Sequence, residues 1–271
     1  MSDQPEVADD RVVLDTHHLD PKSTTQIFTL PIGYLSPDGK LLRDAVVKEM
    51  TGVEEEILAA KGMVTPRLNR VIANCLVEIG GVHADLPMVR ALTMLDRMFL
   101  LIAIRRVSLG DRYEVKLKCP VESCAAENTY EIDLGGLPTS CPDDPTARRH
   151  VSKTPSGSRV EWHTMNGEDE EWLESMRAKL KGEGQSTLAM LSRIDTIDGT
   201  SLPRDGGTDL KRSLGRIVKM SLRDRNALRA AFKQSEGDLD TTIEFQCKAC
   251  QAEFKAEMEV DAEAFFFPSG A

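Results

Sequence analysis

Four of the six cysteines in this 271-residue chain stand in two short pairs, and they constrain the fold more than any other feature. The pairs are Cys119 with Cys124 and Cys247 with Cys250. Each pair interrupts two stretches of alternating polar and apolar residues, a pattern that predicts β-strands. A tight turn can present two thiolates to one tetrahedral ion. The sequence therefore predicts a structural zinc site with these four cysteines as ligands.

The flanking stretches predict two β-hairpins, each with one cysteine pair at its tip. Residues 113–118 and 128–134 flank the first pair, and residues 242–246 and 252–260 flank the second. Two such hairpins facing one another would form a zinc-ribbon-like unit. The pairs are 128 positions apart, whereas a local ribbon separates them by roughly 15–20 residues. One ion would therefore join distant parts of the chain.

Comparison of the chain with itself gives a reason for this separation. An Asp-Arg pair, a glycine and a cysteine follow in the same order in residues 95–119 and in residues 223–247. A weaker match pairs Met50 and Gly52 with Met165 and Gly167. We predict an α+β fold of two pseudo-repeats, each with a strand pair, helices and a β-hairpin, with the hairpins joined in a zinc-ribbon-like unit of four cysteines. Chance similarity is the alternative, because a helix followed by a hairpin is a common order.

The breaks in these patterns predict the domain boundaries. Residues 1–24 are polar and predict a disordered N-terminal tail, and residues 25–135 form the first repeat. Glycines and prolines in residues 136–156 predict a linker, and residues 157–271 form the second repeat with an apolar C-terminal segment.

Within the repeats, apolar spacing predicts helices over residues 66–80 and 88–108. Capping signals predict a helix that begins at Thr51 and another that runs from Ser221 to Gly237.

Other interpretations of the cysteines remain open. The pairs could be incidental buried thiols or two short disulfides, and disulfides would need an oxidising compartment. The first ten residues are polar and acidic, without an apolar signal core. Cys75 lies on the apolar face of a predicted helix, which favours a buried small hydrophobe. Cys141 follows the first hairpin closely and is a spare ligand if Cys124 does not bind.

Composition limits the classes of partner. The net charge of −10 gives a field that repels a phosphate backbone, which argues against nucleic-acid binding. No apolar run reaches the roughly 20 residues of a membrane span. A nucleic-acid adaptor would need a local basic face, for which the candidates are Arg67, Arg70, Arg90, Arg97, Arg105 and Arg106.

Little in the sequence predicts catalysis. Four cysteine ligands close a zinc coordination sphere and leave no position for substrate or activated water, so a metalloenzyme would have to exchange a ligand. None of the histidines shows ligand spacing; they are His17, His18, His83, His150 and His163. We therefore predict a non-enzymatic protein with no catalytic residues and no cofactor beyond zinc.

Two features are candidate partner surfaces. The acidic runs 54–56 and 168–171 fit solvated helix starts, and they could instead meet a basic partner protein. The apolar segment Phe265–Pro268 either folds back on the core or enters a partner's groove.

Several stretches together resemble baseplate hub and tail-assembly proteins of contractile-tailed, T-even-like bacteriophages. They are an early Leu-Pro strand, the Met-Thr-Gly-Val-Glu-Glu-Glu run at 50–56, the Leu-Gly-Asp-Arg-Tyr-Glu-Val run at 109–115, and Phe265-Phe-Phe-Pro268. The resemblance extends from about Gln26 to Pro268. One departure is that the first cysteine pair encloses two more residues than the second.

The resemblance implies a non-enzymatic protein that acts in assembly of the baseplate hub, as a component or as an assembly factor. The expected partners are other tail or hub proteins, including the tape-measure protein, with no nucleic acid and no membrane. The expected locations are the host cytoplasm during assembly and the tail baseplate of the virion. The alternative is a zinc-ribbon nucleic-acid-binding or transcription-type adaptor.

Overall fold

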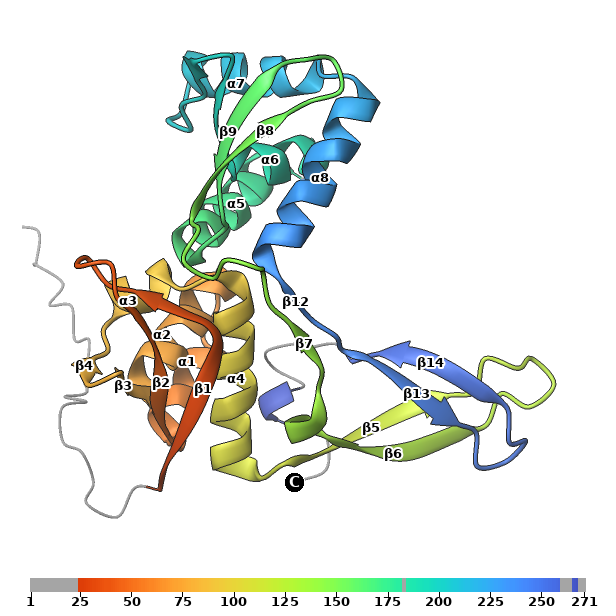
Figure 1. Ribbon diagram of the computed structural model, residues 1–271. Helices are drawn as coiled ribbons and strands as arrows, with labels where there is room; N and C mark the ends of the chain where they lie inside the picture. Colours follow the sequence, from red (N-terminus) through yellow and green to blue (C-terminus); the bar gives the residue numbers. More distant parts are fainter. Residues whose placement is uncertain (1–23, 182–183, 259–264, 268–271) are drawn as a thin grey trace, which may run out of the picture.

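The computed structural model describes residues 24–181, 184–258 and 265–267, so the tail predicted for residues 1–24 lies outside it except for Thr24. The described chain forms two lobes and a projecting arm (Figure 1). We call residues 24–109 the first lobe and residues 149–236 the second lobe. The arm consists of two hairpins, residues 112–133 and 242–257.

The first lobe packs helices against a four-stranded antiparallel sheet of order β1-β2-β3-β4. Its elements are β1 (Thr25–Leu35), β2 (Leu41–Lys48), α1 (Gly52–Ala59), α2 (Val64–Cys75), β3 (Leu76–Ile79), β4 (Val82–His83), α3 (Leu86–Ala91) and α4 (Met94–Leu109). The central helix α4 lies against β1 and β2, and its apolar residues Leu100 and Ile104 are fully buried. Burial of such side chains is the main stabilising contribution to this core.

The second lobe contains a sheet of order β8-β9-β10-β11 with four helices. Its elements are β8 (Arg149–Lys153), β9 (Arg159–His163), α5 (Gly167–Lys179), α6 (Gln185–Leu191), β10 (Ile194–Ile197), β11 (Thr200–Ser201), α7 (Thr208–Val218) and α8 (Leu222–Glu236). Its core is a separate cluster around Trp162, with Leu188, Leu191 and Ile217 among its buried residues. The order of helices and strands is therefore the same in both lobes.

Corresponding helices also begin in corresponding ways. Thr51 and Glu54 form a capping box at α1, and Asn166 and Asp169 form one at α5. Asp96 in the first turn of α4 accepts hydrogen bonds from the amides of Ile32 (2.9 Å) and Gly33 (3.0 Å) in β1. Asp224, in the first turn of α8, accepts one from the amide of Ser156 (2.9 Å) in the β8–β9 turn. In each lobe, one aspartate ties the fourth helix to the first strand pair.

A polar contact surface joins the lobes, and we call it the seam. It lies where α5 packs against α2 and α3. Buried Arg97 contacts Glu170 and donates to Asn69 Oδ1 at 2.8 Å. Arg90 forms an ion pair with Glu171 at 2.9 Å. Glu174 accepts from the amides of residues 64 and 65 at 2.7 and 2.8 Å. The second half of the acidic run 168–171 therefore binds residues of the same chain.

Two short strands, β7 (Thr139–Ser140) and β12 (Asp238–Leu239), form a neck between the second lobe and the arm (Figure 1). They pair in antiparallel register, Ser140 opposite Asp238. Gly237 ends α8 with φ of 69°, and a Cβ there would lie 2.5 Å from the carbonyl oxygen of Ser140. Only glycine fits this close approach, so the helix can end directly at the neck.

The helix predicted over residues 88–108 is in fact two helices, α3 and α4. Leu92 and Thr93 between them are extended, because Thr93 caps α4 by accepting from the amide of Asp96. The helix predicted over residues 66–80 ends at Cys75, and residues 76–79 form β3 instead, since they pair with β2. Residues 136–156, predicted as a linker, contain β7 and β8, so the second sheet begins at Arg149.

Candidate metal centre

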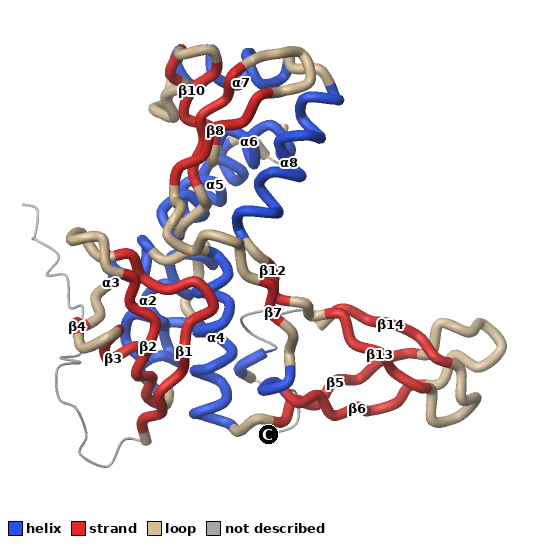
Figure 2. The backbone as a smooth tube through the Cα atoms, in the orientation of Figure 1, coloured by secondary structure: helices blue, strands red, loops and turns tan. Residues whose placement is uncertain are grey.

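The arm consists of two antiparallel hairpins packed against each other (Figure 2). The first joins β5 (Arg112–Lys118) to β6 (Glu127–Asp133), and the second joins β13 (Thr242–Gln246) to β14 (Glu253–Glu257). An aromatic cluster lies between them, in which the ring of Tyr130 is 4.9 Å from Phe245 and 6.1 Å from Phe254. This cluster belongs to the core of the first lobe, so the second hairpin packs with the first half of the chain.

Each cysteine pair lies in the loop that closes its hairpin. The amide of the first cysteine donates across the loop at 2.9 Å, from Cys119 to Ala126 and from Cys247 to Ala252. The residue after the second cysteine has a left-handed backbone in both loops, with φ of 46° at Ala125 and 62° at Gln251. The two loops thus turn the chain in the same way, which points both thiols of a pair to one side.

The two extra residues of the first loop do not disturb this turn. In the second loop, the amide of Gln251 donates to the carbonyl of Cys247 at 2.9 Å. In the first loop, the amide of Ala125 donates to Val121 instead, also at 2.9 Å. The insertion is therefore absorbed between Cys119 and Val121, before the turn that positions Cys124.

The four sulfur atoms meet at the tip of the arm, all within 4.8 Å of one another. Cys119 Sγ is 3.7 Å from Cys250 Sγ, and Cys124 Sγ is 3.8 Å from Cys247 Sγ. A disulfide needs about 2.05 Å, so these thiols are not bonded to each other. A tetrahedron with zinc–sulfur distances of about 2.3 Å has edges of about 3.8 Å. The predicted residues thus form a set that could hold a metal ion.

The surroundings favour thiolate at one position. The backbone amides of Cys250 and Ala249 donate toward the sulfur of Cys247 and lower the pKa of this thiol to about 6. Asn128 Nδ2 approaches the same sulfur at 3.6 Å. The pKa of Cys119 shifts the other way: the amide of Val121 lowers it, but burial and the neighbouring thiols outweigh this effect and raise the pKa to about 12. A bound cation would stabilise the thiolate form of the cysteines and so oppose the effect of the neighbouring thiols on the pKa of Cys119.

Tyr130, two residues after Asn128 on β6, brings a second polar group toward the cluster. Its hydroxyl is buried and has no hydrogen-bond partner among the described residues. Burial, followed by the charges of Cys247 and Cys119, raises the pKa of Tyr130. A buried hydroxyl without an acceptor is costly, and a thiolate sulfur would supply one. The sequence analysis did not identify Asn128 and Tyr130 as neighbours of the site. They are two positions apart on a predicted strand beside the cysteine loop, so the strand pattern places them on the same face.

The other two cysteines lie away from the cluster. Cys75 is fully buried at the end of α2, as predicted, and burial raises the pKa of its thiol. Cys141 is exposed, and its thiol donates to the carbonyl of Pro31 at 3.3 Å. Cys141 does not belong to the four-sulfur group, so the spare-ligand alternative finds no support.

One histidine lies in a charged cluster that sequence reasoning missed. His163 Nδ1 is 2.9 Å from Asp195 and Nε2 is 3.1 Å from Asp169, which also pairs with Arg204. Burial alone lowers the pKa of His163, but the hydrogen bonds to Asp169 and Asp195 outweigh it and raise it to about 9. Asp169 lies in the first turn of α5, so this cluster positions the helix that carries the acidic side of the seam. His83 is exposed and His150 stacks on Trp162, while His17 and His18 lie outside the described residues.

The apolar C-terminal segment folds back on the core. Phe265 and Phe266 are buried, and Arg105 donates to the carbonyl of Phe265 at 2.8 Å. The ring of Phe265 lies 5.3 Å from that of Tyr113. Pro268 lies outside the described residues. This contact joins the end of the chain to α4 and to the base of the arm.

The arginines considered for a basic face are largely engaged elsewhere. Arg90 and Arg97 belong to the seam, Arg105 is buried against Phe265, and Arg106 pairs with Asp111 at 2.7 Å. Four of the six arginines proposed for the nucleic-acid alternative are therefore engaged within the chain.

No helix within the described residues is long and apolar enough to cross a membrane.

Comparisons with known proteins identify the family. No curated protein and no solved structure matches the chain at a significant level. The family model described as T4 bacteriophage base plate protein matches residues 37–266, which include most of the first lobe, the whole second lobe and all four cysteines of the cluster. The chain therefore belongs to the family of T4 bacteriophage base plate proteins.

Proposed function

We propose that the protein acts without catalysis in assembly of the bacteriophage baseplate hub, as a hub component or an assembly factor. The observation that carries this proposal is the family match over residues 37–266. The expected partners are other tail or hub proteins, including the tape-measure protein. The expected locations are the host cytoplasm during assembly and then the tail.

In this proposal the four clustered cysteines bind one structural zinc ion. Sulfur separations of 3.7 and 3.8 Å support it, because they match the edges of a zinc–thiolate tetrahedron. When bound, zinc would supply folding energy by linking the loops at Cys119 and Cys247. Four protein ligands leave no open coordination position, which supports a structural role over a catalytic one.

We further infer that the two lobes arose from a duplicated unit, each copy with half of the metal site. The shared order of elements supports this, as do the aspartates Asp96 and Asp224, which perform the same task in each lobe. In the proposed account, the metal closes a joint between the two copies. A rigid body built this way suits a protein on which others assemble.

The metal is tested on the purified protein by elemental analysis and by absorption spectra of a cobalt-substituted sample. One zinc per chain and a cobalt spectrum of four-sulfur tetrahedral coordination are expected. A cobalt spectrum that indicates a bound water ligand would contradict the structural role and favour a metalloenzyme.

The assembly role is tested separately by co-expression with the hub and tape-measure proteins of the same phage, followed by pull-down. Recovery of at least one of them in a stoichiometric complex is expected. If none is recovered while the zinc content is normal, the assembly proposal fails and the metal proposal stands.

A further inference from the structure

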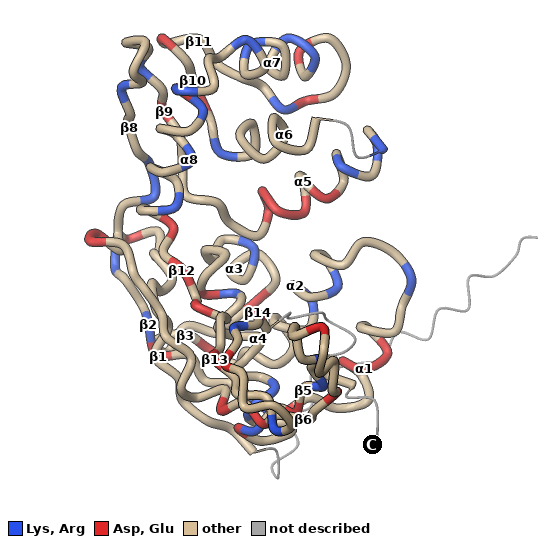
Figure 3. The backbone as a smooth tube through the Cα atoms, turned by 90° about the vertical axis from the view of Figure 1, so that its right-hand side faces the viewer, with Lys and Arg blue, Asp and Glu red and all other residues tan. Residues whose placement is uncertain are grey.

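Helices α7 and α8 carry a concentration of positive charge that is unusual for this chain. The chain has a net charge of −10, yet eight lysines and arginines lie between residues 211 and 233. They are Lys211, Arg212, Arg216, Lys219, Arg223, Arg225, Arg229 and Lys233. Figure 3 shows the basic residues of α7 at the end of the second lobe, whereas the acidic start of α5 faces the first lobe.

Few carboxylates within the described residues neutralise this charge. Asp224 is buried and holds the β8–β9 turn, and Glu236 is buried in a two-bond ion pair with Arg193. The ion pairs made by the eight cations are both at the surface: Arg212 with Asp209, and Lys233 with Asp238 at 3.5 Å. Such exposed pairs contribute little and exchange easily for others.

One face of α8 combines this charge with exposed apolar surface. Leu222, Asn226, Arg229 and Lys233 follow one another at helical spacing, so they lie on the same face. Leu222 is 69% exposed. From Leu222 to Lys233 this face is about 16 Å long, which suits a segment of a few residues in extended or helical form.

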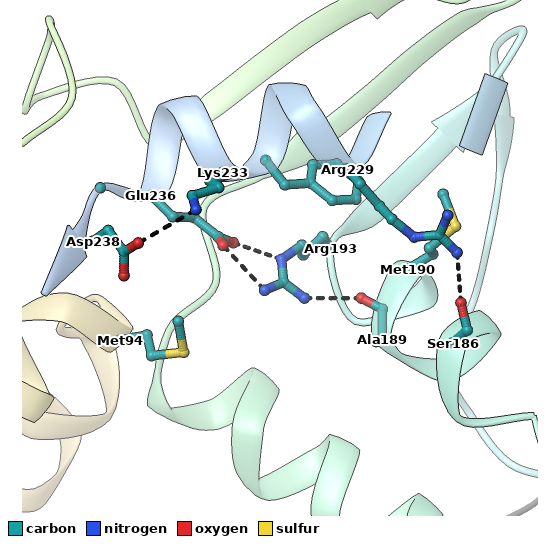
Figure 4. A pocket seen from close by; sticks show the side chains of 11 residues that line it. Met94, Ser186, Ala189, Met190, Arg193, Arg229, Lys233, Glu236 and Asp238 are labelled. Atoms are coloured by element: carbon teal, nitrogen blue, oxygen red, sulfur yellow. Dashed lines mark hydrogen bonds and ion pairs between the residues drawn. The ribbon is translucent and has the colours of Figure 1, made fainter. Parts of the chain in front are cut away.

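The face leads into a pocket of about 430 Å³ between the lobes (Figure 4). Its apolar lining comes from Met94 at the start of α4, Met190 of α6 and Phe232 of α8. Arg229 and Lys233 lie at its edge, where Arg229 bonds to Ser186 Oγ at 2.7 Å and to no carboxylate among the described residues. Met94 is 37% exposed. Glu236 and Asp238 also line the pocket, but they are already paired with Arg193 and Lys233. The pocket therefore offers apolar contact inside and, at the rim, the guanidinium of Arg229 without a carboxylate partner among the described residues.

We propose that the face formed by Leu222, Asn226, Arg229 and Lys233, together with this pocket, binds an acidic segment of a partner protein. An apolar side chain of the segment enters the pocket, and carboxylates beside it pair with Arg229 and Lys233. Nucleic acid fits less well, because a phosphate backbone offers nothing to Leu222, Met94 or Phe232 and because the rest of the chain repels it. The inference goes beyond the proposed function, which does not say where a partner binds.

The test uses a fluorescein-labelled acidic peptide in which leucines stand between glutamates, and measures binding to the full chain by fluorescence anisotropy. Saturable binding is expected, weakened about tenfold or more by Arg229→Glu with Lys233→Glu, and by Met94→Asp in the pocket. Lys211→Glu with Arg212→Glu reverses two exposed charges on α7 and changes the net charge by the same amount, so it is the matched control and should bind as the unaltered chain does. Thermal unfolding of each variant shows that it is folded.

Three results would overturn the proposal. One is equal binding by the double reversal at Arg229 and Lys233 and by the double reversal at Lys211 and Arg212. Another is equal binding of polyglutamate, since the pocket would then contribute nothing. The third is tighter binding of duplex DNA than of the peptide at the same salt concentration, which would assign the surface to nucleic acid instead.

Discussion

Two of the contacts between the halves of this protein, the arm and the seam, are held together by different chemistry. At the arm, two hairpins share an aromatic cluster and bring four thiols together. At the seam, Arg97, Arg90 and Asn69 of the first lobe meet Glu170 and Glu171 of α5. The arm depends on groups that must lose protons to bind a metal, whereas the seam depends on charges that are already paired. Chelators should therefore weaken the arm and leave the seam unchanged, and the two contacts should respond in opposite ways to pH.

The largest effect is expected from removing a metal ligand. Cys247→Ser should abolish stoichiometric zinc binding and loosen the arm, because structural zinc contributes on the order of 10 kcal/mol to the folding of small sites. Metal analysis and limited proteolysis of the hairpins measure this. Cys141→Ser, which alters an exposed cysteine outside the cluster, is the control. Full zinc content in the Cys247→Ser variant would show that the arm is not held together by a metal bound to Cys247.

The seam should fail next, and without any loss of metal. Arg97→Met leaves the carboxylate of Glu170 without its partner, so unfolding should become easier by about 3 kcal/mol. Chemical denaturation measures the free energy, and metal analysis shows that the arm is intact. Arg112→Met breaks an exposed pair with Glu131 in the arm and should cost less than about 1 kcal/mol. If both variants lose the same free energy of unfolding, the buried ion pair of the seam stabilises the protein no more than an exposed pair does.

A smaller effect separates the two contacts by pH. The pKa of His163 is raised to about 9 in the folded chain, above the ordinary 6.5. Its stabilising contribution is therefore fully present below about pH 6.5 and lost as the pH rises through 9. Unfolding free energies between about pH 6 and 10 should fall in the unaltered chain and change less in His163→Gln. Acid acts on the other contact, because protonated thiols release metal. A His163→Gln variant with an unchanged pH profile would contradict this assignment.

The smallest effect concerns the hydroxyl of Tyr130. We expect it to donate to a metal-bound thiolate, so Tyr130→Phe should weaken metal binding about tenfold and shift the sulfur-to-cobalt charge-transfer band. Tyr113→Phe removes a hydroxyl from the neighbouring strand, beside Phe265, and should leave both unchanged. If the band does not move in Tyr130→Phe, the hydroxyl only fills space between the hairpins.

Features that depend on local sequence could be predicted. The cysteine hairpins, the capping box at Thr51 and the helix from Ser221 to Gly237 all follow from short-range patterns, and they lie where expected. Prediction failed where tertiary contacts override the local pattern. Residues 76–79 continue an apolar helical pattern but pair with β2, and residues 149–153 form the outer strand of the second sheet.

The seam shows the same limit at the level of single side chains. Glu170 and Glu171 have the sequence signature of a solvated helix start, and nothing nearby in the sequence shows that Arg97 and Arg90 are their partners. Likewise, His163 gains its carboxylate partners from a helix and from another strand. Long-range pairs of this kind depend on how the lobes pack, which a single sequence does not reveal.

The neck has a consequence for engineering. Because Ser140 and Asp238 are directly opposite in β7 and β12, the whole second lobe is topologically an insertion into the unit formed by the first lobe and the arm. A short turn from Ser140 to Asp238 would excise it without stretching the backbone, and would leave both hairpins and the Phe265 contact in one continuous chain. Such a miniature protein would separate what the arm does alone from what the inserted lobe adds.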